Sequence, residues 1–391
     1  ISPFTRRPWL YVGLALTWVI PAVLLSSNPH GAHIGLVGGT EAWNYALNQC
    51  VVISGYLYKA VWPQLLTIDY GPARLLQWTD VWPQAVFLLL LLALVALSLW
   101  RWPAVGFALA FFFIVLSPTS SFVAINNEVG AERRVYLPLA ALAGLVAAGG
   151  WFLLVERSAQ WKRIGLIAFC AWLMWSARAT YQRGEEFASL ISIWETAVEA
   201  VPDNPRAHAQ LGDALVAAGR YAESIHSYRR ALAAWPDLGL AHRGLGGALA
   251  QMQRHEAAVI HYSAAVKLLP GLAVLHLELA RELDQCGRLD EALEHYRRAV
   301  ELAPRDVLLR GELADALLQN RDLAAALAQF QQALTLDLTN AQLFNNAGVC
   351  LGSMGRYEEA IVHFRRALQL DESHDKARHN LRAALRVRGD T

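Results

Sequence analysis

The sequence has few of the features that mark common catalytic or metal sites. It contains no glycine-rich phosphate loop and no GxSxG, HExxH or CxxC motif. Charge of one sign is not in excess, because 34 Lys and Arg residues face 33 Asp and Glu residues, and this argues against nucleic acid as a partner. We therefore expect neither a cofactor nor a bound metal ion. The four cysteines have no metal or disulfide spacing: Cys50, Cys170, Cys286 and Cys350.

One spacing organises the second half of the chain. Four prolines lie 34 residues apart, and a fixed period of about this length is typical of helical solenoids. The pattern predicts two antiparallel helices per period, with a small residue that permits close approach and an aromatic residue that fills the space between them. Proline, which has no N–H, is expected to end the second helix. The residues in phase are Pro202, Pro236, Pro270 and Pro304; Leu211, Leu245, Leu279 and Leu313; Gly212, Gly246, Ala280, Ala314 and Gly348; Tyr228, Tyr262, Tyr296, Phe330 and Phe364; and Ala231, Ala265, Ala299, Ala333 and Ala367.

This period and its recurring residues resemble the tetratricopeptide repeat family over residues 205–372. The resemblance implies five repeats stacked as an α-solenoid. Gly219, Gly287 and Gly355 are expected at the turns between paired helices, where glycine permits a positive φ. The fifth repeat has Glu372 in place of the closing proline, and residues 373–391 are expected to form a basic capping helix.

The first half of the chain has a different composition. Residues 1–204 hold only 12 basic and 11 acidic residues, and 12 of the 14 tryptophans precede Trp194. Few charges, long apolar runs and many tryptophans are typical of a membrane domain with interfacial aromatics. Because the sequence begins at Ile1 rather than at methionine, we expect residues 1–180 to be the C-terminal part of a longer membrane domain. The predicted crossings are 9–25, 83–100, 104–116, 135–155 and 164–179.

Loop charge predicts on which side the repeats lie. The basic loop 156–163 is expected to be cytoplasmic. Counting crossings from it places the repeats outside, in the periplasm or in a eukaryotic lumen. Arg6 and Arg7 then lie inside only if the moderately apolar segment 44–62 is an interfacial helix. The alternative is six crossings with both arginines outside. The predicted fold is thus all-α: a membrane helix bundle with about five crossings plus one interfacial helix, followed by a tetratricopeptide solenoid.

A predicted external loop contains residues suited to bind a lipid phosphate. Glu132, Arg133 and Arg134, followed closely by Tyr136, lead directly into the apolar run 135–155. Paired guanidinium groups bind phosphate through bidentate hydrogen bonds, and polar groups at membrane depth suggest a site. The alternative is that the two arginines anchor the helix among lipid headgroups.

The order of the motifs gives a second resemblance. It is similar to multi-spanning membrane glycosyltransferases with tetratricopeptide tails, which include the transmembrane-and-tetratricopeptide O-mannosyltransferase group and bacterial relatives. The motifs, in order, are WP at 62–63, DY at 69–70, SPTSS at 117–121 and ERRVYLP at 132–138.

This resemblance implies a sugar donor linked to polyprenyl phosphate and bound at the external face, with a catalytic acid upstream of Ile1. It also implies lipid-phosphate contacts for Glu132, Arg133, Arg134 and Tyr136. Asp69 and Tyr70 are further candidates for the same cavity. For Asp69 the alternative is a turn or N-cap residue.

Histidines recur at two positions of the repeat. Residues one repeat apart lie on neighbouring units, too far apart to share one ion, so we interpret them as packing or solvation of the repeats. The two sets are His208, His242 and His276, and His261, His295 and His363.

Residues 181–204 are expected to join the two parts as a helical junction. Leu190, Trp194 and Ala197 match the second-helix positions of a degenerate repeat that ends at Pro202. The alternative is a flexible linker, but residues 187–200 contain no glycine or proline and their apolar spacing is helical.

The first helices of such a solenoid are expected to form a concave groove. A mixture of charged and amide groups there suits an extended peptide, although ordinary solvation is the alternative for any single member. Two functions follow: a membrane glycosyltransferase whose repeats hold a protein acceptor, or a membrane-anchored scaffold without catalysis. The expected groove residues are Asp213, Arg243, Glu278, Arg281, Glu312, Asp315, Asn345 and Asn346.

Overall fold

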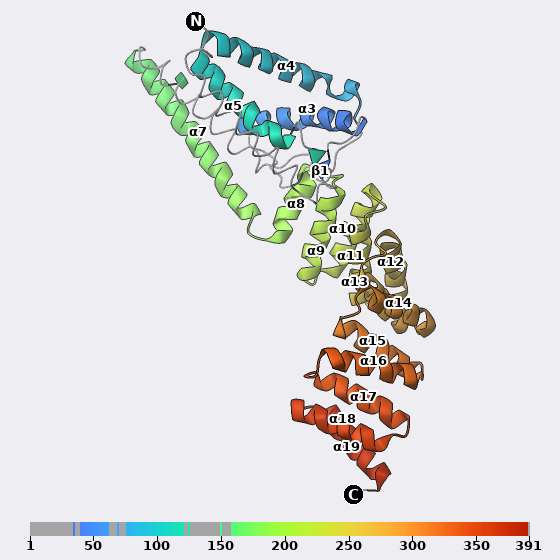
Figure 1. Ribbon diagram of the computed structural model, residues 1–391. Helices are drawn as coiled ribbons and strands as arrows, with labels where there is room; N and C mark the ends of the chain where they lie inside the picture. Colours follow the sequence, from blue (N-terminus) through green and yellow to red (C-terminus); the bar gives the residue numbers. More distant parts are fainter. Residues whose placement is uncertain are drawn as a thin grey trace, which may run out of the picture. The chain divides into compact units, whose positions relative to one another are not determined.

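The chain folds into two compact units, Ile1–Ala214 and Leu215–Thr391. The computed structural model describes residues 34–35, 40–61, 69, 76–120, 124–125, 149–150 and 158–389. In these residues both units are built almost entirely of α-helices, as the sequence predicts (Figure 1). The exception is a two-residue antiparallel pairing between β1 (Ile34–Gly35) and β2 (Ala124–Ile125).

Three apolar helices pack together in the first unit. α4 (Trp78–Arg101) contacts both α3 (Thr40–Val61) and α5 (Pro103–Ser120). The turn predicted at residues 101–103 is present, because the Trp102 N–H closes the end of α4 on Ser98 O at 2.7 Å and Pro103 begins the next helix. The core of the three-helix group contains Val52, Ile53, Tyr56, Leu88 and Phe112.

In the described part of the chain, α4 is the one helix that is both long and apolar enough to cross a bilayer. A buried core helix of a soluble protein meets the same criterion, although Leu89 and Leu90 of α4 are 62% and 66% exposed. The predicted segments 104–116 and 164–179 are helical as well, within α5 and α7 (Ala159–Glu186). Segment 9–25 and most of 135–155 lie outside the described residues, so the number of crossings stays a prediction.

The predicted junction helix is divided in the structure. α7 continues to Glu186, and α8 (Leu190–Ala200) begins after a short turn. The turn is stabilised by Ser189, whose hydroxyl accepts a hydrogen bond from Ser192 N at 3.0 Å as an N-cap. α7 contacts α8, so the two helices pair where a first and second helix of a repeat would be expected.

Ten helices of nearly constant length follow, and a last helix covers their end (Figure 1). Within the second unit, the four later second helices each pack against their own first helix, and all five second helices pack against the next helix along the chain. The first helices are α9 (Pro205–Ala217), α11 (Gly239–Gln251), α13 (Ala273–Gln285), α15 (Val307–Gln319) and α17 (Ala341–Ser353). The second helices are α10 (Tyr221–Ala234), α12 (His255–Leu268), α14 (Leu289–Leu302), α16 (Leu323–Leu336) and α18 (Tyr357–Leu370), and the last helix is α19 (Asp375–Arg388).

The recurring residues form the core that the period predicts. All five aromatic residues are at most 6% exposed, and the alanine three residues after each of them is fully buried. The small residues permit the close approach of paired helices. A Cβ at Gly348 would lie 2.6 Å from Phe364 Cε1, and one at Gly246 would lie 3.1 Å from the Tyr262 ring.

The turns between paired helices all require a left-handed residue. Gly219, Gly287 and Gly355 have φ of 75–77°, as expected, whereas Gln253 and Arg321 adopt φ of 59° and 62° at the same position of their repeats. Residues with a Cβ are strained in this region, where glycine is not.

We expect Arg321→Gly to raise the free energy of unfolding by about 0.5–1 kcal/mol, because it relieves this strain. The measurement is urea unfolding of the full chain followed by far-UV circular dichroism. The matched control is Arg305→Gly, an exposed position outside this turn. A loss of stability in Arg321→Gly would contradict the strain argument.

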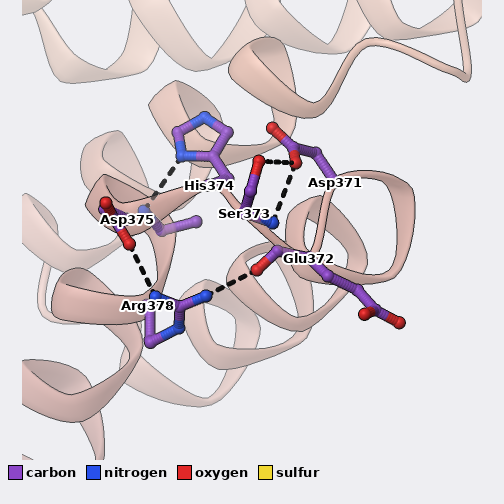
Figure 2. Close-up of polar contacts among 7 residues, drawn as sticks. Asp371, Glu372, Ser373, His374, Asp375 and Arg378 are labelled. Carbon is purple, nitrogen blue, oxygen red and sulfur yellow. Dashed lines mark hydrogen bonds and ion pairs between the residues drawn. The ribbon is translucent and has the colours of Figure 1, made fainter.

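The four prolines each follow the end of a second helix, as expected, but proline is not required in every repeat. Leu338 and Glu372 replace the proline in the last two repeats, yet α16 and α18 end at the same position as the other second helices. A carboxylate closes these two turns instead. Asp337 Oδ1 accepts hydrogen bonds from Thr339, and Asp371 Oδ1 accepts them from Ser373 N at 2.9 Å and Ser373 Oγ at 2.6 Å (Figure 2).

The predicted capping helix is present as α19. His374 is its N-cap, since the ring Nδ1 accepts a hydrogen bond from Ala377 N at 3.2 Å (Figure 2). Arg378 fixes the first turn through Asp375 at 2.6 Å and through the carbonyl of Glu372, also at 2.6 Å (Figure 2). α19 packs on α17 and α18 and presents a basic outer side.

Candidate functional site

The first helices of the second unit share one continuous face. α15 contacts α17 directly, and α17 contacts α19, although a second helix separates each pair along the chain. Residues three, four and seven positions apart lie on the same side of a helix. We call this surface the first-helix face. On α13 it comprises residues 274, 278 and 281. On the other first helices it comprises the residues that lie one or more 34-residue periods before or after these.

Polar side chains cross the first-helix face from one repeat to the next. Arg243 of α11 donates to Glu278 of α13 at 2.6 and 2.8 Å, and Arg281 donates to Glu312 of α15 at 2.5 Å. Further along, Asn346 Nδ2 is 2.8 Å from Asp315 Oδ1, and Asn380 Nδ2 of α19 is 3.0 Å from Asn345 Oδ1. We call these contacts the polar ladder.

The structure thus places seven of the eight predicted groove residues close together, where most of them form hydrogen bonds or ion pairs with one another. The eighth, Asp213, belongs to the first unit, where Gln210 Nε2 lies 3.5 Å from its Oδ2. Within the polar ladder, two guanidinium groups face three carboxylates. The ladder therefore fixes the register of neighbouring repeats and leaves a modest negative charge on the face.

Asp315 holds its charge less easily than an ordinary aspartate. Solvent reaches its side chain, but the helices around it remove much of its hydration, and this burial raises the pKa to about 6. The Glu312 carboxylate acts in the same direction, and the hydrogen bond from Asn346 acts against both. A cation from a partner would stabilise the ionised form of Asp315.

Sequence reasoning missed an exposed apolar row on the same face. Leu240, Val274 and Leu308 lie one repeat apart and are 60%, 40% and 57% exposed. We call them the apolar row. They could have been found by aligning the repeats, because each directly precedes a first-helix residue that is fully or almost fully buried. In the next repeat this position is Gln342.

Most of the predicted lipid-phosphate residues lie outside the described residues. These are Tyr70, Glu132, Arg133, Arg134 and Tyr136. The pairing of β1 with β2 joins residues 34–35 to residues 124–125, which belong to the two predicted external loops before the crossings 83–100 and 135–155. No metal-binding group of three or more His, Cys, Asp or Glu side chains occurs among the residues that the structure describes.

Asp69, also proposed to contact lipid phosphate, stabilises the start of the first repeat. Its carboxylate forms an ion pair with Arg206 of α9 at 2.7 Å, and its carbonyl accepts a hydrogen bond from Asn204 Nδ2 at 3.2 Å. The Asn204 side chain, 1% exposed, also caps α9 by accepting from Arg206 N and Ala207 N. These contacts give Asp69 a structural role, although a different one from the turn or N-cap of the sequence alternative.

We expect Asp69→Ala to lower the free energy of local opening at the start of α9 by about 1–3 kcal/mol, because the partly buried Arg206 guanidinium loses its ionic partner. Hydrogen exchange of peptides covering residues 200–212 in the full chain measures this. Asp80→Ala is the control, since Asp80 interacts only with its own helix start in the described contacts. The exchanged pair Asp69→Arg with Arg206→Asp should restore part of the protection; unchanged exchange in Asp69→Ala would contradict the assignment.

The chain was compared with known families and structures. The family described as Tetratricopeptide repeat matches residues 177–237, 209–273, 277–341 and 341–374. No curated protein matches the sequence. Among solved structures, "YrrB: a TPR protein with an unusual peptide-binding site" is 22% identical and covers 48% of this chain and 96% of its own, with a TM-score of 0.45. The MamA protein of Desulfovibrio magneticus RS-1 is 19% identical over 44% of this chain and 97% of its own, with a TM-score of 0.42.

The family matches agree with the stacked helix pairs, the buried aromatic residues and the turn positions described above. They begin at residue 177, so they also include the α7–α8 pair that precedes the first regular repeat. The part of the chain from residue 177 to residue 374 is therefore an array of tetratricopeptide repeats.

Proposed function

We propose that this protein is a membrane-anchored scaffold whose first-helix face binds an extended segment of a partner protein. The observation that carries the proposal is the apolar row beside the polar ladder on one continuous face. Leucine and valine side chains are exposed at these three positions, although the residue after each is buried in the core. An unpaired apolar row with polar groups at its side is the surface that an extended peptide requires.

The geometry of the row limits the conformation of the segment. The side-chain contacts Arg243–Glu278 and Arg281–Glu312 join α11 to α13 and α13 to α15. Packed helices lie about 8–10 Å apart, and we take this distance as the advance of the apolar row per repeat. A polyproline II segment advances about 9 Å in three residues and returns to the same side each time. A segment with an apolar residue at every third position would therefore place one side chain on each of Leu240, Val274 and Leu308.

The charges on the face limit the composition of the segment. Glu312 and Asp315 lie on α15 beside the last member of the apolar row, and the three carboxylates of the polar ladder outnumber its two guanidinium groups. A lysine or arginine next to an apolar residue would pair with this end of the face. We therefore propose a partner segment with apolar residues three apart and a basic residue at the α15 end.

Photo-crosslinking at single positions tests the binding face. A photoreactive amino acid placed at Val274 should give crosslinks in cells that map to one segment of the proposed composition. The same residue placed at Ile260 of α12, which is 67% exposed, is the matched control on a second helix. Equal crosslinks from both positions would refute the proposed face.

Anchorage in the membrane rests on the composition of the first half and on the length and apolar character of α4. Sugar transfer from a polyprenyl-phosphate donor is supported by the sequence resemblance, and its residues Glu132, Arg133, Arg134 and Tyr136 lie outside the described residues. Scaffolding is the preferred function because the described contacts support it directly. A transfer assay with the full chain and with Arg133→Ala plus Arg134→Ala would distinguish the two.

A further inference from the structure

In the first four repeats, one side chain of the first helix reaches back to the carbonyl group before that helix. His242 Nε2 lies 3.0 Å from Pro236 O, and His276 Nε2 lies 3.3 Å from Pro270 O. In the next repeat Arg310 makes the same contact, since its Nε donates to Pro304 O at 2.9 Å. An N–H donor at this position therefore holds the start of the first helix in these repeats, whereas the fifth repeat has Phe344 there.

Two of these side chains are paired with a second histidine. His242 Nδ1 lies 3.1 Å from His261 Nδ1 of α12, and His276 Nδ1 lies 3.0 Å from His295 Nδ1 of α14. The rings of each pair also face one another, with centroids 5.4 and 5.2 Å apart. We call these two sets the histidine pairs.

The hydrogen bonds assign the protons of each neutral pair. A carbonyl oxygen only accepts, so His242 and His276 carry their proton on Nε2 and their Nδ1 accepts. The facing Nδ1 of His261 or His295 must then be the donor. One added proton can be accommodated if the facing ring changes tautomer. With two added protons, two N–H groups point at each other and the contact is lost.

The surroundings of the pairs also disfavour charge. Burial lowers the pKa of His261, and His242 and Arg229 of α10 lower it further. Burial likewise lowers the pKa of His276 and of His295. At His276 the hydrogen bond to Pro270 opposes the effect of burial on the pKa, and Arg298 of α14 adds to it. At His295 the His276 ring adds to the effect of burial on the pKa, and Glu294 and Glu291 of α14 oppose it.

We propose that the two histidine pairs make the second and third repeats an acid-sensitive segment of the solenoid, which loosens below about pH 6.5. Unfolding lets every histidine take up a proton at its ordinary pKa of about 6.5, whereas each folded pair holds at most one. Stability is therefore full above pH 6.5 and falls as the pH drops. At pH 5.5 the folding constant should fall at least about sixfold per pair, and roughly 30-fold for both.

The fourth and fifth repeats show the same position without a histidine pair. Arg310 donates to Pro304 and also, through Nη1, to Gln329 Oε1 at 3.0 Å, an arrangement whose charge is fixed. In the fifth repeat Phe344 packs on His363 with ring centroids 5.7 Å apart. Asp315 acts in the opposite direction to the pairs, because its raised pKa favours the folded state as the pH falls through about 6.

The test is hydrogen exchange of the full chain at pH 7.5 and pH 5.5, corrected for the intrinsic exchange rate. Protection in α11–α14 is expected to fall by roughly 30-fold or more, while protection in α15–α18 changes much less. The control variant carries the arrangement of the fourth repeat: His242→Arg, His261→Gln, His276→Arg and His295→Gln. It should lose most of the pH dependence in α11–α14.

A second variant covers the case in which the fourfold variant does not fold. His261→Gln with His295→Gln keeps both proline contacts and gives each remaining histidine an amide partner that suits either protonation state. Wild-type protection in α11–α14 that is independent of pH, or equal pH dependence in wild type and variant, would overturn the proposal. Exchange of the histidine C2 hydrogens provides an independent check: uptake of two protons by either pair above pH 6 would also overturn it.

Discussion

Replacing Phe330 by alanine is expected to lower the free energy of unfolding by about 3–5 kcal/mol, the largest stability effect that we predict for a single site. Phe330 lies on α16 in the middle of the array and is fully buried. Its ring fills the space between paired helices, and the tight contacts at Gly348 and Phe364 show how little room such sites leave for rearrangement. The cavity would therefore persist rather than collapse.

Urea unfolding of the full chain, with hydrogen exchange to locate the effect, measures this change. Each repeat is stabilised by its neighbours, so the loss should be concentrated in α15–α18 and should separate the repeats on either side. Val362→Ala is the matched control, because Val362 is 63% exposed and its loss should change stability by less than about 0.5 kcal/mol. A loss below about 1 kcal/mol in Phe330→Ala would contradict the assigned core.

Changing Leu240, Val274 and Leu308 together to glutamate is expected to weaken binding of the partner segment at least about 100-fold. A few apolar anchors commonly supply 2 kcal/mol or more each at such interfaces, and about 1.4 kcal/mol corresponds to a tenfold change. The added carboxylates would attract the basic residue of the segment and so would not weaken binding by themselves. A loss of affinity would therefore come from the lost apolar contacts. The free energy of unfolding should change little, because all three side chains are exposed.

The measurement is titration of the full chain with the segment identified by crosslinking at Val274. The control is Ile260→Glu with Val362→Glu, which adds the same kind of charge at exposed apolar positions on second helices. Binding should be retained in this control. Equal losses in both variants would show that charge rather than the apolar row determines affinity.

The repeats could be predicted closely because their period fixes both the helices and the core. The aromatic residues such as Phe330, the small residues such as Gly348 and the turn glycines all occur where the 34-residue spacing places them. The ends of the last two second helices could not be predicted from proline, because hydrogen bonds in the Asp337 and Asp371 turns follow these helices instead.

The pairing of side chains could not be predicted from the period alone. Arg243 and Glu278 were expected in the groove, but their ion pair depends on how far each repeat is rotated relative to the next. The contact between Asp69 and Arg206 joins residues 137 positions apart and leaves no local pattern in the sequence. The apolar row recurs with the period, but its exposure is known only from the structure, because exposed and buried apolar residues look alike in the sequence.

Hydrogen exchange of the full chain with and without the crosslinked segment tests whether the first-helix face binds the partner. We predict that the segment increases protection in the exposed parts of α11, α13 and α15 and leaves α12, α14 and α16 nearly unchanged. Protection confined to the second helices, or to the first unit, would contradict the account.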